Sequence, residues 1–332
     1  MSRPVRWGIL STANIGRGAV IPAIHASANG EVVAIASREQ SRAELFARAQ
    51  NIPRAHASYE ALLDDPDVDA LYIPLPNSLH REWTIRAAQA GKHVLCEKPL
   101  ALDAAQCDEM AAAARDAGVV LMEAFMYRFH PRTERVLAML RDGIVGDLRA
   151  IRSAFTFRLT KPGNIRLDPD LGGGALMDVG CYAVNVSRTL AGAEPVEVSA
   201  TARWTDRGVD DELTGVLRFE TGLTAHFDCA LTMERCEFYE AAGTDALLRV
   251  EKAFLPGTDD CVIEERRGRA GTTEHTVGGA DEYQLMVEHF ADAVLNGTPV
   301  RYGPEEAAAN MRVIEALYRS ARAGGRPQEV QA

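Results

Sequence analysis

The stretch Val5-Arg6-Trp7-Gly8-Ile9-Leu10-Ser11-Thr12-Ala13-Asn14-Ile15-Gly16 opens the chain with an apolar run that ends in a turn of small residues. An apolar run of this length, bounded by a turn, predicts a buried strand over residues 5–10. A helix is expected to follow the turn and to end near residue 28. The first N–H groups of such a helix can bind an anion, such as the pyrophosphate of a dinucleotide.

The turn departs from the dinucleotide-binding fingerprint G-x-G-x-x-G. When Gly16 is taken as the last glycine, Ser11 and Ala13 stand where the first two glycines are expected. Both residues are small, so the backbone can still approach a pyrophosphate. The residues expected to contact the cofactor here are Ser11, Thr12, Ala13, Asn14 and Ile15. Taken alone, the turn is explained equally well as an ordinary strand-to-helix connection.

The second predicted strand, residues 32–36, favours a phosphorylated cofactor. A ribose-binding acidic residue is expected roughly 20 residues beyond the loop, but Ser37 and Arg38 follow this strand. An arginine can form two hydrogen bonds to a 2′-phosphate and stack on the adenine, whereas a carboxylate would repel the phosphate. NADP is therefore expected in preference to NAD, with Ser37 and Arg38 as contacts. The alternative is a solvated arginine at the start of a helix.

The rest of the chain predicts an α/β protein with two different domains. Short apolar strands at residues 70–73 and 94–96 alternate with helices, which is typical of a parallel sheet with right-handed crossovers. Beyond Glu123, strands with two-residue alternation and short links predict an antiparallel sheet. The candidate strands are residues 148–157, 196–204, 213–219, 224–231 and 236–241, and the candidate helices are residues 131–141, 172–190, 281–296 and 304–323. We expect one domain over residues 1–123 and a second over residues 124–332.

Composition and charge argue against several classes of function. The net charge of −11 disfavours binding to nucleic acid or to an anionic membrane, because phosphate groups need a basic surface. No apolar run approaches the roughly 20 residues that span a bilayer. The apolar run near the start is too short for a signal peptide, so a cytoplasmic location is expected. The six cysteines and eight histidines show no metal-ligand spacing, so neither a disulfide nor a metal site is expected.

Two short motifs, far apart in the chain, carry residues that can move a proton. The first is Glu97-Lys98-Pro99, and the second is Gly172-Gly173-Gly174-Ala175-Leu176-Met177-Asp178-Val179-Gly180-Cys181-Tyr182. A free tyrosine has a pKa of about 10, and a nearby lysine ammonium favours the phenolate. Lys98 and Tyr182 are therefore a suitable acid/base pair, and Asp178, one helical turn before Tyr182, can orient a hydroxyl or hold the lysine. Structural roles are the alternative, since a buried tyrosine usually finds a hydrogen-bond partner.

With these motifs the chain resembles the glucose–fructose oxidoreductase/inositol dehydrogenase family over nearly its whole length. Two further matching stretches are Leu75-Pro76-Asn77-Ser78-Leu79-His80 and Met122-Glu123-Ala124-Phe125-Met126-Tyr127-Arg128-Phe129-His130-Pro131. The second stretch is most similar to the branch that holds NADP-dependent D-xylose dehydrogenases and dihydrodiol dehydrogenases. Any one motif can arise by chance, but all of them in order and at the family's spacing form a specific signal.

The resemblance implies a Rossmann domain, followed by an α/β domain with an open, mainly antiparallel sheet. It places Lys98 and Tyr182 on either side of the nicotinamide, with Tyr182 as the acid/base, and it adds Leu75, Pro76, Asn77, His80 and Glu97 to the cofactor contacts. The candidates for the substrate pocket are polar or aromatic: Arg128, His130, Arg166 and Tyr283. The family commonly uses the outer face of the second sheet as a subunit interface, which implies a homodimer or homotetramer.

The expected activity is NADP-dependent oxidation of an aldose at C1 to the lactone, with D-xylose or D-glucose as substrate. The residue chemistry supports only alcohol/carbonyl redox, and the sugar comes from the resemblance. Two enzymatic alternatives stay open: an NADPH-dependent reductase of a keto-sugar or dicarbonyl, and a trans-dihydrodiol dehydrogenase. A non-catalytic regulator that binds the dinucleotide is disfavoured, because such members can dispense with the lysine and the acid/base residue, and both are retained here.

Overall fold

The computed structural model describes residues 3–161 and 163–331, and it divides into two compact units. The first unit is the chain up to Met126 together with Asp281–Ala308, and the second is Tyr127–Ala280 together with the chain from Ala309 onward. One helix from the C-terminal third therefore belongs to the first unit. The domains expected at residues 1–123 and 124–332 remain a prediction. Pro162 lies outside the described residues.

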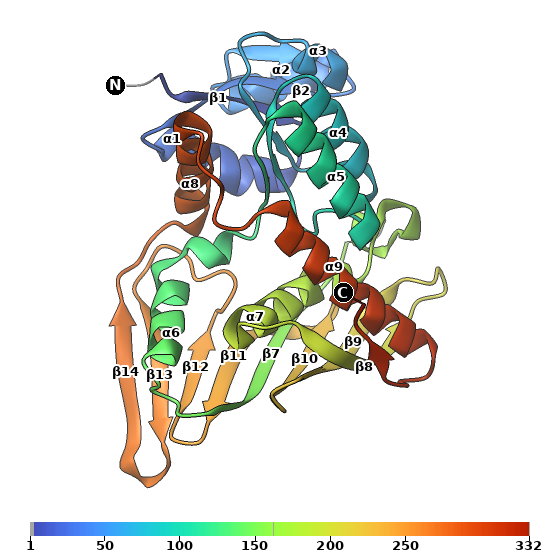
Figure 1. Ribbon diagram of the computed structural model, residues 1–332. Helices are drawn as coiled ribbons and strands as arrows, with labels where there is room; N and C mark the ends of the chain where they lie inside the picture. The colour runs from blue at the N-terminus through green and yellow to red at the C-terminus, as the bar shows by residue number, and fades with distance from the viewer. Residues whose placement is uncertain (1–2, 162, 332) are drawn as a thin grey trace. The chain divides into compact units, whose positions relative to one another are not determined.

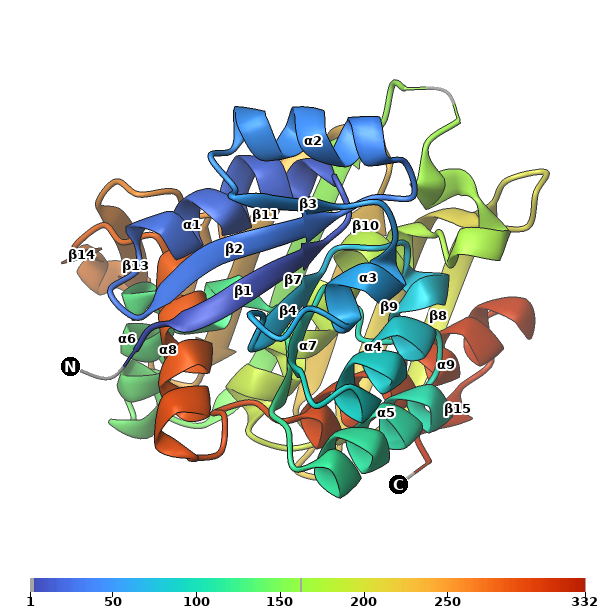
Figure 2. The same ribbon diagram turned by 90° about the horizontal axis from the view of Figure 1, so that it is seen from above.

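The first unit contains a six-stranded sheet in the order β3-β2-β1-β4-β5-β6, in which every pair is parallel. Figure 2 shows β3, β2, β1 and β4 side by side. The strands are β1 (Val5–Leu10), β2 (Gly30–Ala36), β3 (Arg54–His56), β4 (Ala70–Ile73), β5 (His93–Cys96) and β6 (Leu121–Glu123). The order reverses between β1 and β4, the kind of point at which doubly wound sheets bind ligands. The predicted parallel α/β sheet is confirmed.

Helices pack on this sheet through apolar faces. They are α1 (Ile21–Ala26), which continues from the π-helical segment η1 (Gly16–Val20), α2 (Gln40–Ala49), α3 (Tyr59–Leu63), α4 (His80–Gln89), α5 (Ala104–Ala117) and α8 (Glu282–Asn296), with the 3₁₀ turn η2 (Asn77–Leu79). Helices α1 and α8 lie side by side, and α4 packs on α5 (Figure 1). The ring of Phe290 on α8 lies 5.1 Å from that of Trp7 on β1, both fully buried, so α8 completes the core of this unit.

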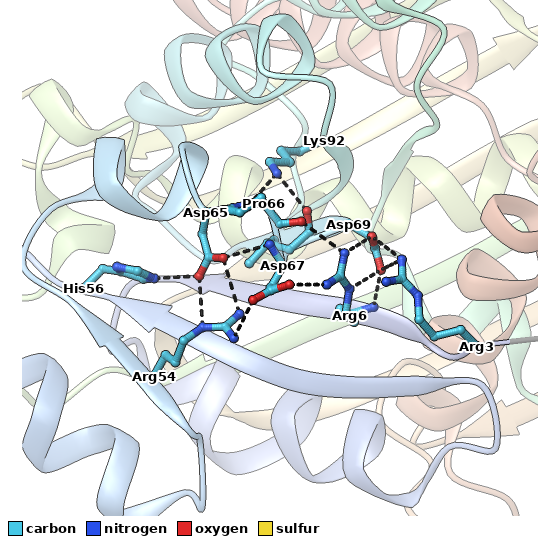
Figure 3. A network of polar contacts seen from close by, with 10 residues as sticks. Arg3, Arg6, Arg54, His56, Asp65, Pro66, Asp67, Asp69 and Lys92 are labelled. Carbon is cyan, nitrogen blue, oxygen red and sulfur yellow. Dashed lines mark hydrogen bonds and ion pairs between the residues drawn. The ribbon is translucent and has the colours of Figure 1, made fainter.

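Charged side chains tie together the loops that precede the strands of this sheet (Figure 3). Arg6 donates hydrogen bonds to both carboxylate oxygens of Asp69, at 3.1 and 2.9 Å. Arg54 pairs with Asp65 at 3.1 Å, and the buried Lys92 donates to the carbonyl oxygen of Asp65 at 2.8 Å. Burial alone would raise the pKa of Asp65, but its hydrogen bonds and the charge of Arg54 hold it below its usual value. This network ties the loops before β4 and β5 to β1 and β3.

The second unit contains a nine-stranded sheet in the order β14-β13-β12-β11-β7-β10-β9-β8-β15. Its strands are β7 (Leu148–Arg158), β8 (Pro195–Trp204), β9 (Asp210–Phe219), β10 (Thr224–Ala230), β11 (Thr232–Gly243), β12 (Leu247–Glu251), β13 (Cys261–Arg267), β14 (Gly271–Val277) and β15 (Gln328–Glu329). Only β10 and β7 pair in parallel, so the predicted mainly antiparallel sheet is confirmed. Strands β12 to β15 were not predicted, because β13 and β14 are rich in charged and polar residues.

The helices of the second unit cover one face of this sheet (Figure 1). They are α6 (Pro131–Arg141), α7 (Cys181–Ala191) and the part of α9 (Pro304–Arg322) from Ala309 onward. Short turns complete the unit: η3 (Met126–Phe129), η4 (Ile165–Leu167), η5 (Pro169–Leu171), the π-helical η6 (Leu176–Gly180) and η7 (Gly268–Ala270). Helix α7 packs on β7 and β10, and α9 reaches β8 where Ala200 N–H donates to Ser320 Oγ at 2.9 Å.

Candidate active site

The predicted cofactor residues of the first unit all follow the carboxyl ends of parallel strands. They come after β1 (Ser11, Thr12, Ala13, Asn14, Ile15), after β2 (Ser37, Arg38), after β4 (Leu75, Pro76, Asn77, His80) and after β5 (Glu97, Lys98). Because the strands are parallel, these ends share one edge of the sheet, at the point where the strand order reverses. The structure therefore brings this predicted set to one edge.

The turn after β1 has the backbone that the fingerprint calls for. Ser11 has φ of 136°, a conformation that favours glycine, at the position of the first expected glycine. Its hydroxyl donates to Pro74 O and accepts from Ala13 N–H, both at 3.3 Å, which joins this turn to the loop after β4. Asn14 and Ile15 at the start of the helix are exposed, and no side chain caps η1. Uncapped N–H groups at a helix start fit the pyrophosphate of a dinucleotide.

Arg42 and Tyr59, which lie near Arg38 just after the end of β2, were not predicted from the sequence. Burial raises the pKa of Tyr59, and the positive charges of Arg38 and Arg42 act in the opposite direction, so both guanidinium groups lie near this phenol. Arg38 and Arg42 are exposed. A pair of exposed arginines beside a phenol fits a 2′-phosphate. Arg42 lies in the first turn of α2, and Arg38 lies in the connection between β2 and this helix.

Glu97 holds the backbone that leads into Lys98. Its Oε1 accepts a 2.5 Å hydrogen bond from the hydroxyl of Tyr72, and its Oε2 accepts from the N–H of Lys98 at 3.3 Å. Burial raises the pKa of Tyr72 well above its usual value, and the charges of Glu97 and of Tyr283 raise it further. Tyr72 therefore remains a neutral donor to the Glu97 carboxylate. Glu97 and Lys98 are half-buried, and the Lys98–Pro99 peptide bond is cis.

His80 joins two loops of the cofactor edge through buried hydrogen bonds. Its side chain is fully buried, with Nδ1 2.9 Å from Pro99 O and Nε2 2.8 Å from Leu75 O. The ring thus joins the loop after β4 to the loop after β5, which carries Lys98. Burial lowers the pKa of His80 below its usual value. Its contribution to the cofactor site is therefore to hold both loops rather than to contact a ligand.

In the second unit, Asp178 and Tyr182 lie on one continuous helical segment. The sequence predicted an ordinary α-helix here, but residues Leu176–Gly180 form a π-helical turn before α7 begins at Cys181. A π turn is wider than an α turn, so the expectation of one α-helical turn between Asp178 and Tyr182 is corrected. Tyr182 is 5% exposed. Its ring packs against those of Phe254, Phe155 and Tyr127, at centroid distances of 5.2, 5.4 and 6.0 Å.

Arg166, predicted as a substrate residue, contacts Asp178 directly. Its Nε lies 2.5 Å from Asp178 Oδ2, and its guanidinium lies 5.8 Å from the centre of the Phe157 ring. The glycine run makes this approach possible, because a Cβ on Gly173 would stand 2.5 Å from the carbonyl oxygen of Arg166. The side chain of Arg166 is 39% exposed and that of Asp178 14% exposed, so the pair is reachable from solvent.

The other predicted substrate residues are Arg128, His130 and Tyr283. Arg128 and His130 are buried, at 5% and 1% exposure, and His130 Nδ1 accepts the N–H of Arg132 at 3.0 Å to cap α6. Burial and, to a smaller extent, the charge of Arg132 together lower the pKa of His130 to about 4, so the ring is neutral at pH 7. Tyr283 belongs to the first unit, near Tyr72 at the start of α8.

No helix in the described ranges is long and apolar enough to cross a membrane. Within residues 3–161 and 163–331, no group of three or more His, Cys, Asp or Glu side chains is placed to hold a metal ion. The predicted catalytic residues are Lys98 in the first unit and Asp178 and Tyr182 in the second.

Comparisons with known proteins identify relatives that match this chain over nearly its whole length. A curated relative, the D-xylose 1-dehydrogenase (NADP(+)) 2 of Haloferax volcanii, is 44% identical over 96% of this chain and 98% of its own. The trans-1,2-dihydrobenzene-1,2-diol dehydrogenase of Xenopus tropicalis is 40% identical over 94% of this chain and 95% of its own. A crystal structure of a 3-ketoreductase from Actinomadura kijaniata with NADP and TDP-benzene has a TM-score of 0.92, with 34% identity over 96% of this chain and 98% of that one.

Family models cover both units. The family described as "Oxidoreductase family, NAD-binding Rossmann fold" matches residues 5–125, and the one described as "GFO/IDH/MocA C-terminal domain" matches residues 133–249. The first match contains the edge that follows β1, β2, β4 and β5, and the second contains Arg166, Asp178 and Tyr182. This chain is therefore an oxidoreductase of the GFO/IDH/MocA family.

Proposed function

We propose that the protein is an NADP-dependent dehydrogenase that oxidises an aldose at C1 to the lactone, with D-xylose as the first substrate to test. The observation that carries the proposal is the 44% identity, over 96% of the chain, to a D-xylose 1-dehydrogenase that uses NADP. The acid/base candidates Lys98 and Tyr182 are both present in this chain.

Tyr182 is assigned as the base that takes the proton from the sugar hydroxyl. NADP, when bound, supplies the acceptor for the hydride. A phenol is a poor base at neutral pH because its usual pKa is about 10, and burial disfavours its charged form further. A cation is therefore needed, and we assign this part to the ammonium of Lys98. The backbone N–H of Lys98 is held by the Glu97 carboxylate just after the end of β5. General acid/base catalysis of this kind typically contributes about 10²–10⁴-fold.

Asp178 and Arg166 are assigned to the substrate. Their 2.5 Å ion pair fixes the carboxylate, which can accept a hydrogen bond from a sugar hydroxyl while the guanidinium donates to another. A polyhydroxylated ring offers donors and acceptors for both groups. The buried His130 can offer only its Nε2 to a substrate, because its Nδ1 accepts the N–H of Arg132 at the start of α6.

The cofactor assignment rests on the edge of the parallel sheet. The uncapped start of η1 suits the pyrophosphate, and Arg38 with Arg42 suits the 2′-phosphate that distinguishes NADP from NAD. Ser37, Leu75, Pro76 and Asn77 complete the predicted contacts, and His80 supports the loops. The cytoplasmic location and a homodimer or homotetramer formed through the nine-stranded sheet remain predictions.

A second candidate function is reduction of a keto-sugar. It is favoured by the TM-score of 0.92 to the 3-ketoreductase of Actinomadura kijaniata, and the same residues can return a proton to a carbonyl oxygen. Oxidation of a trans-dihydrodiol is a third, supported by the 40% identity to the Xenopus tropicalis enzyme.

The experiment that separates these functions follows absorbance in the reduced-nicotinamide band with purified protein. NADP is offered with a panel of aldoses led by D-xylose and with a trans-dihydrodiol, and NADPH is offered with keto-sugars and dicarbonyls. Formation of NADPH with a pentose or hexose, and of the matching lactone, is the expected result. Turnover only with NADPH and a carbonyl substrate would instead favour the reductase.

A further inference from the structure

A carboxylate from a distant strand holds the start of the segment that carries Asp178 and Tyr182. Asp210, the first residue of β9, accepts the backbone N–H of Leu176 through Oδ2 at 2.7 Å. Leu176 is the first residue of η6, and the preceding Ala175 provides no side-chain cap. Asp210 is 1% exposed, so its carboxylate is committed to this interior position. It supplies the acceptor that the segment lacks locally.

Tyr318 on α9 holds the other oxygen of the same carboxylate. Its hydroxyl donates to Asp210 Oδ1 at 2.7 Å. Gly174 lies against both partners, because a Cβ at this residue would overlap Asp210 Oδ1 and Tyr318 Oη. The last glycine of the run therefore provides the space into which the pair fits.

The pair is connected to the reacting residues by short paths. The carbonyl oxygen of Gly174 accepts the N–H of Asp178 at 2.9 Å. A second residue of α9, the buried Asn310, donates from Nδ2 to the carbonyl oxygen of Cys181, next to Tyr182, at 3.3 Å. Helix α9 thus anchors the segment both at its start and beside Tyr182.

We propose that Asp210 and Tyr318 act together as a positioning pair, which fixes the start of the helical segment that carries Asp178 and Tyr182. The pair touches neither substrate nor cofactor and acts through the position of these two side chains. The role in catalysis rests on the proposed function, whereas the role in ordering the segment does not.

The carboxyl group of Asp210 changes its charge within the pH range of an activity assay. Burial raises the pKa of Asp210 to about 6, although the hydrogen bonds from Leu176 and Tyr318 oppose this shift. The titratable groups that interact with it are Asp211 on its own strand, Cys229 on β10 and Tyr318 on α9. Cys229 in turn lies near Cys181 and Asp228, and Tyr318 lies near Arg322. Among them, Tyr318 donates directly to the ionised carboxylate, so it determines how readily Asp210 loses its proton.

The test uses Tyr318→Phe and Asp210→Asn in the full-length protein with NADP and the best aldose of the panel. Tyr318→Phe should lower kcat by roughly ten-fold or more while KM for NADP stays unchanged, since misplacing a reacting group by about 1 Å can cost about 100-fold. The acid limb of its kcat profile should also move to higher pH, because the carboxylate loses a donor. Asp210→Asn should remove this limb, since the amide does not ionise.

Tyr239→Phe is the matched control. Tyr239 is also buried, at 1% exposure, but within the described part of the chain its hydroxyl has no hydrogen-bond partner, and it lies on β11, away from the segment. This variant should keep the wild-type kcat and pH profile. Equal effects of Tyr239→Phe and Tyr318→Phe, or a kcat and pH profile unchanged in Tyr318→Phe, would overturn the positioning role.

Hydrogen–deuterium exchange of the amides at residues 174–182 gives a readout independent of activity. In Tyr318→Phe these amides should exchange faster than in wild type, whereas the amides of α8 should not change. Faster exchange in a protein that turns over no sugar would refute the proposed function and keep the ordering role of the pair. Unchanged exchange would refute the pair itself, and it remains decisive if Asp210→Asn fails to fold.

Discussion

Two described π-helical segments, one in each unit, lie in the helical segments to which the proposed function assigns cofactor binding and proton transfer. η1 precedes α1 at the nucleotide edge, η6 precedes α7, and neither receives a side-chain cap from its own N-cap residue. The two segments differ in the surroundings of their first backbone N–H groups. The residues before η1 are exposed, whereas the N–H of Leu176 in η6 is bonded to the buried Asp210. In the proposed function, the same backbone feature binds a ligand in one unit and, in the other, fixes the segment that carries the proposed acid/base residue.

The largest effect is expected for a variant that removes a group assigned to proton transfer. Lys98→Ala should lower kcat by about 10²–10⁴-fold, the usual range for an acid/base group, while the affinity for NADPH remains. NADPH fluorescence gives the affinity and steady-state kinetics the turnover. A turnover equal to that of wild type would remove Lys98 from the proton-transfer step.

A smaller effect is expected at the nucleotide edge. Arg38→Ala and Arg42→Ala should each weaken NADP binding by roughly 1.5–3 kcal/mol, the range of hydrogen bonds to a charged group, with little effect on NAD. Arg48→Ala is the matched control, because Arg48 is an exposed arginine on α2, the helix that carries Arg42, and forms a 4.0 Å ion pair with Glu44. Calorimetric titration measures both cofactors. Equal losses of NADP and NAD affinity would mean that these arginines do not recognise the 2′-phosphate.

The smallest effect concerns the stability that depends on Asp210. Because burial raises its pKa to about 6, this group stabilises the fold most when protonated, and the contribution is lost as the pH rises from about 4 through 6. Between pH 5 and pH 7.5 the free energy of unfolding should therefore fall by about 1 kcal/mol more in wild type than in Asp210→Asn. Urea unfolding at the two pH values measures this difference. Parallel curves for the two proteins would mean that Asp210 is ionised over the whole range.

The nucleotide edge could be predicted from sequence because each part of it is local. The run from Val5 to Leu10 forms a buried strand, its turn carries small residues, and Arg38 follows the next strand directly. The sequence also placed Asp178 and Tyr182 on one predicted helix, since they share one short motif, and their catalytic roles remain predictions. What it left out depends on tertiary contacts or on backbone detail. The π turn leaves no mark in the side-chain pattern, and the pairing of Asp178 with Arg166 depends on a loop path.

The anchoring of η6 is the clearest case of this limit. Asp210, Tyr318 and Leu176 come from a strand, a distant helix and the segment itself, and no spacing in the sequence links them. Strand β14 was missed for a different reason. Its residues Gly271 to Val277 are mostly polar and lie at the edge of the sheet, so they lack the apolar alternation that marks a strand.

The most direct measurement is the rate of NADP reduction by D-xylose, or by the best aldose of the panel, in wild type and in Tyr182→Phe. The phenyl ring keeps the aromatic contacts with Phe155 and Phe254 and removes only the hydroxyl. We predict NADPH formation by the wild type, a loss of about 10²–10⁴-fold in the variant, and equal NADPH affinity in both. A variant that reduces NADP as fast as the wild type would contradict the assignment of Tyr182 as the proton acceptor.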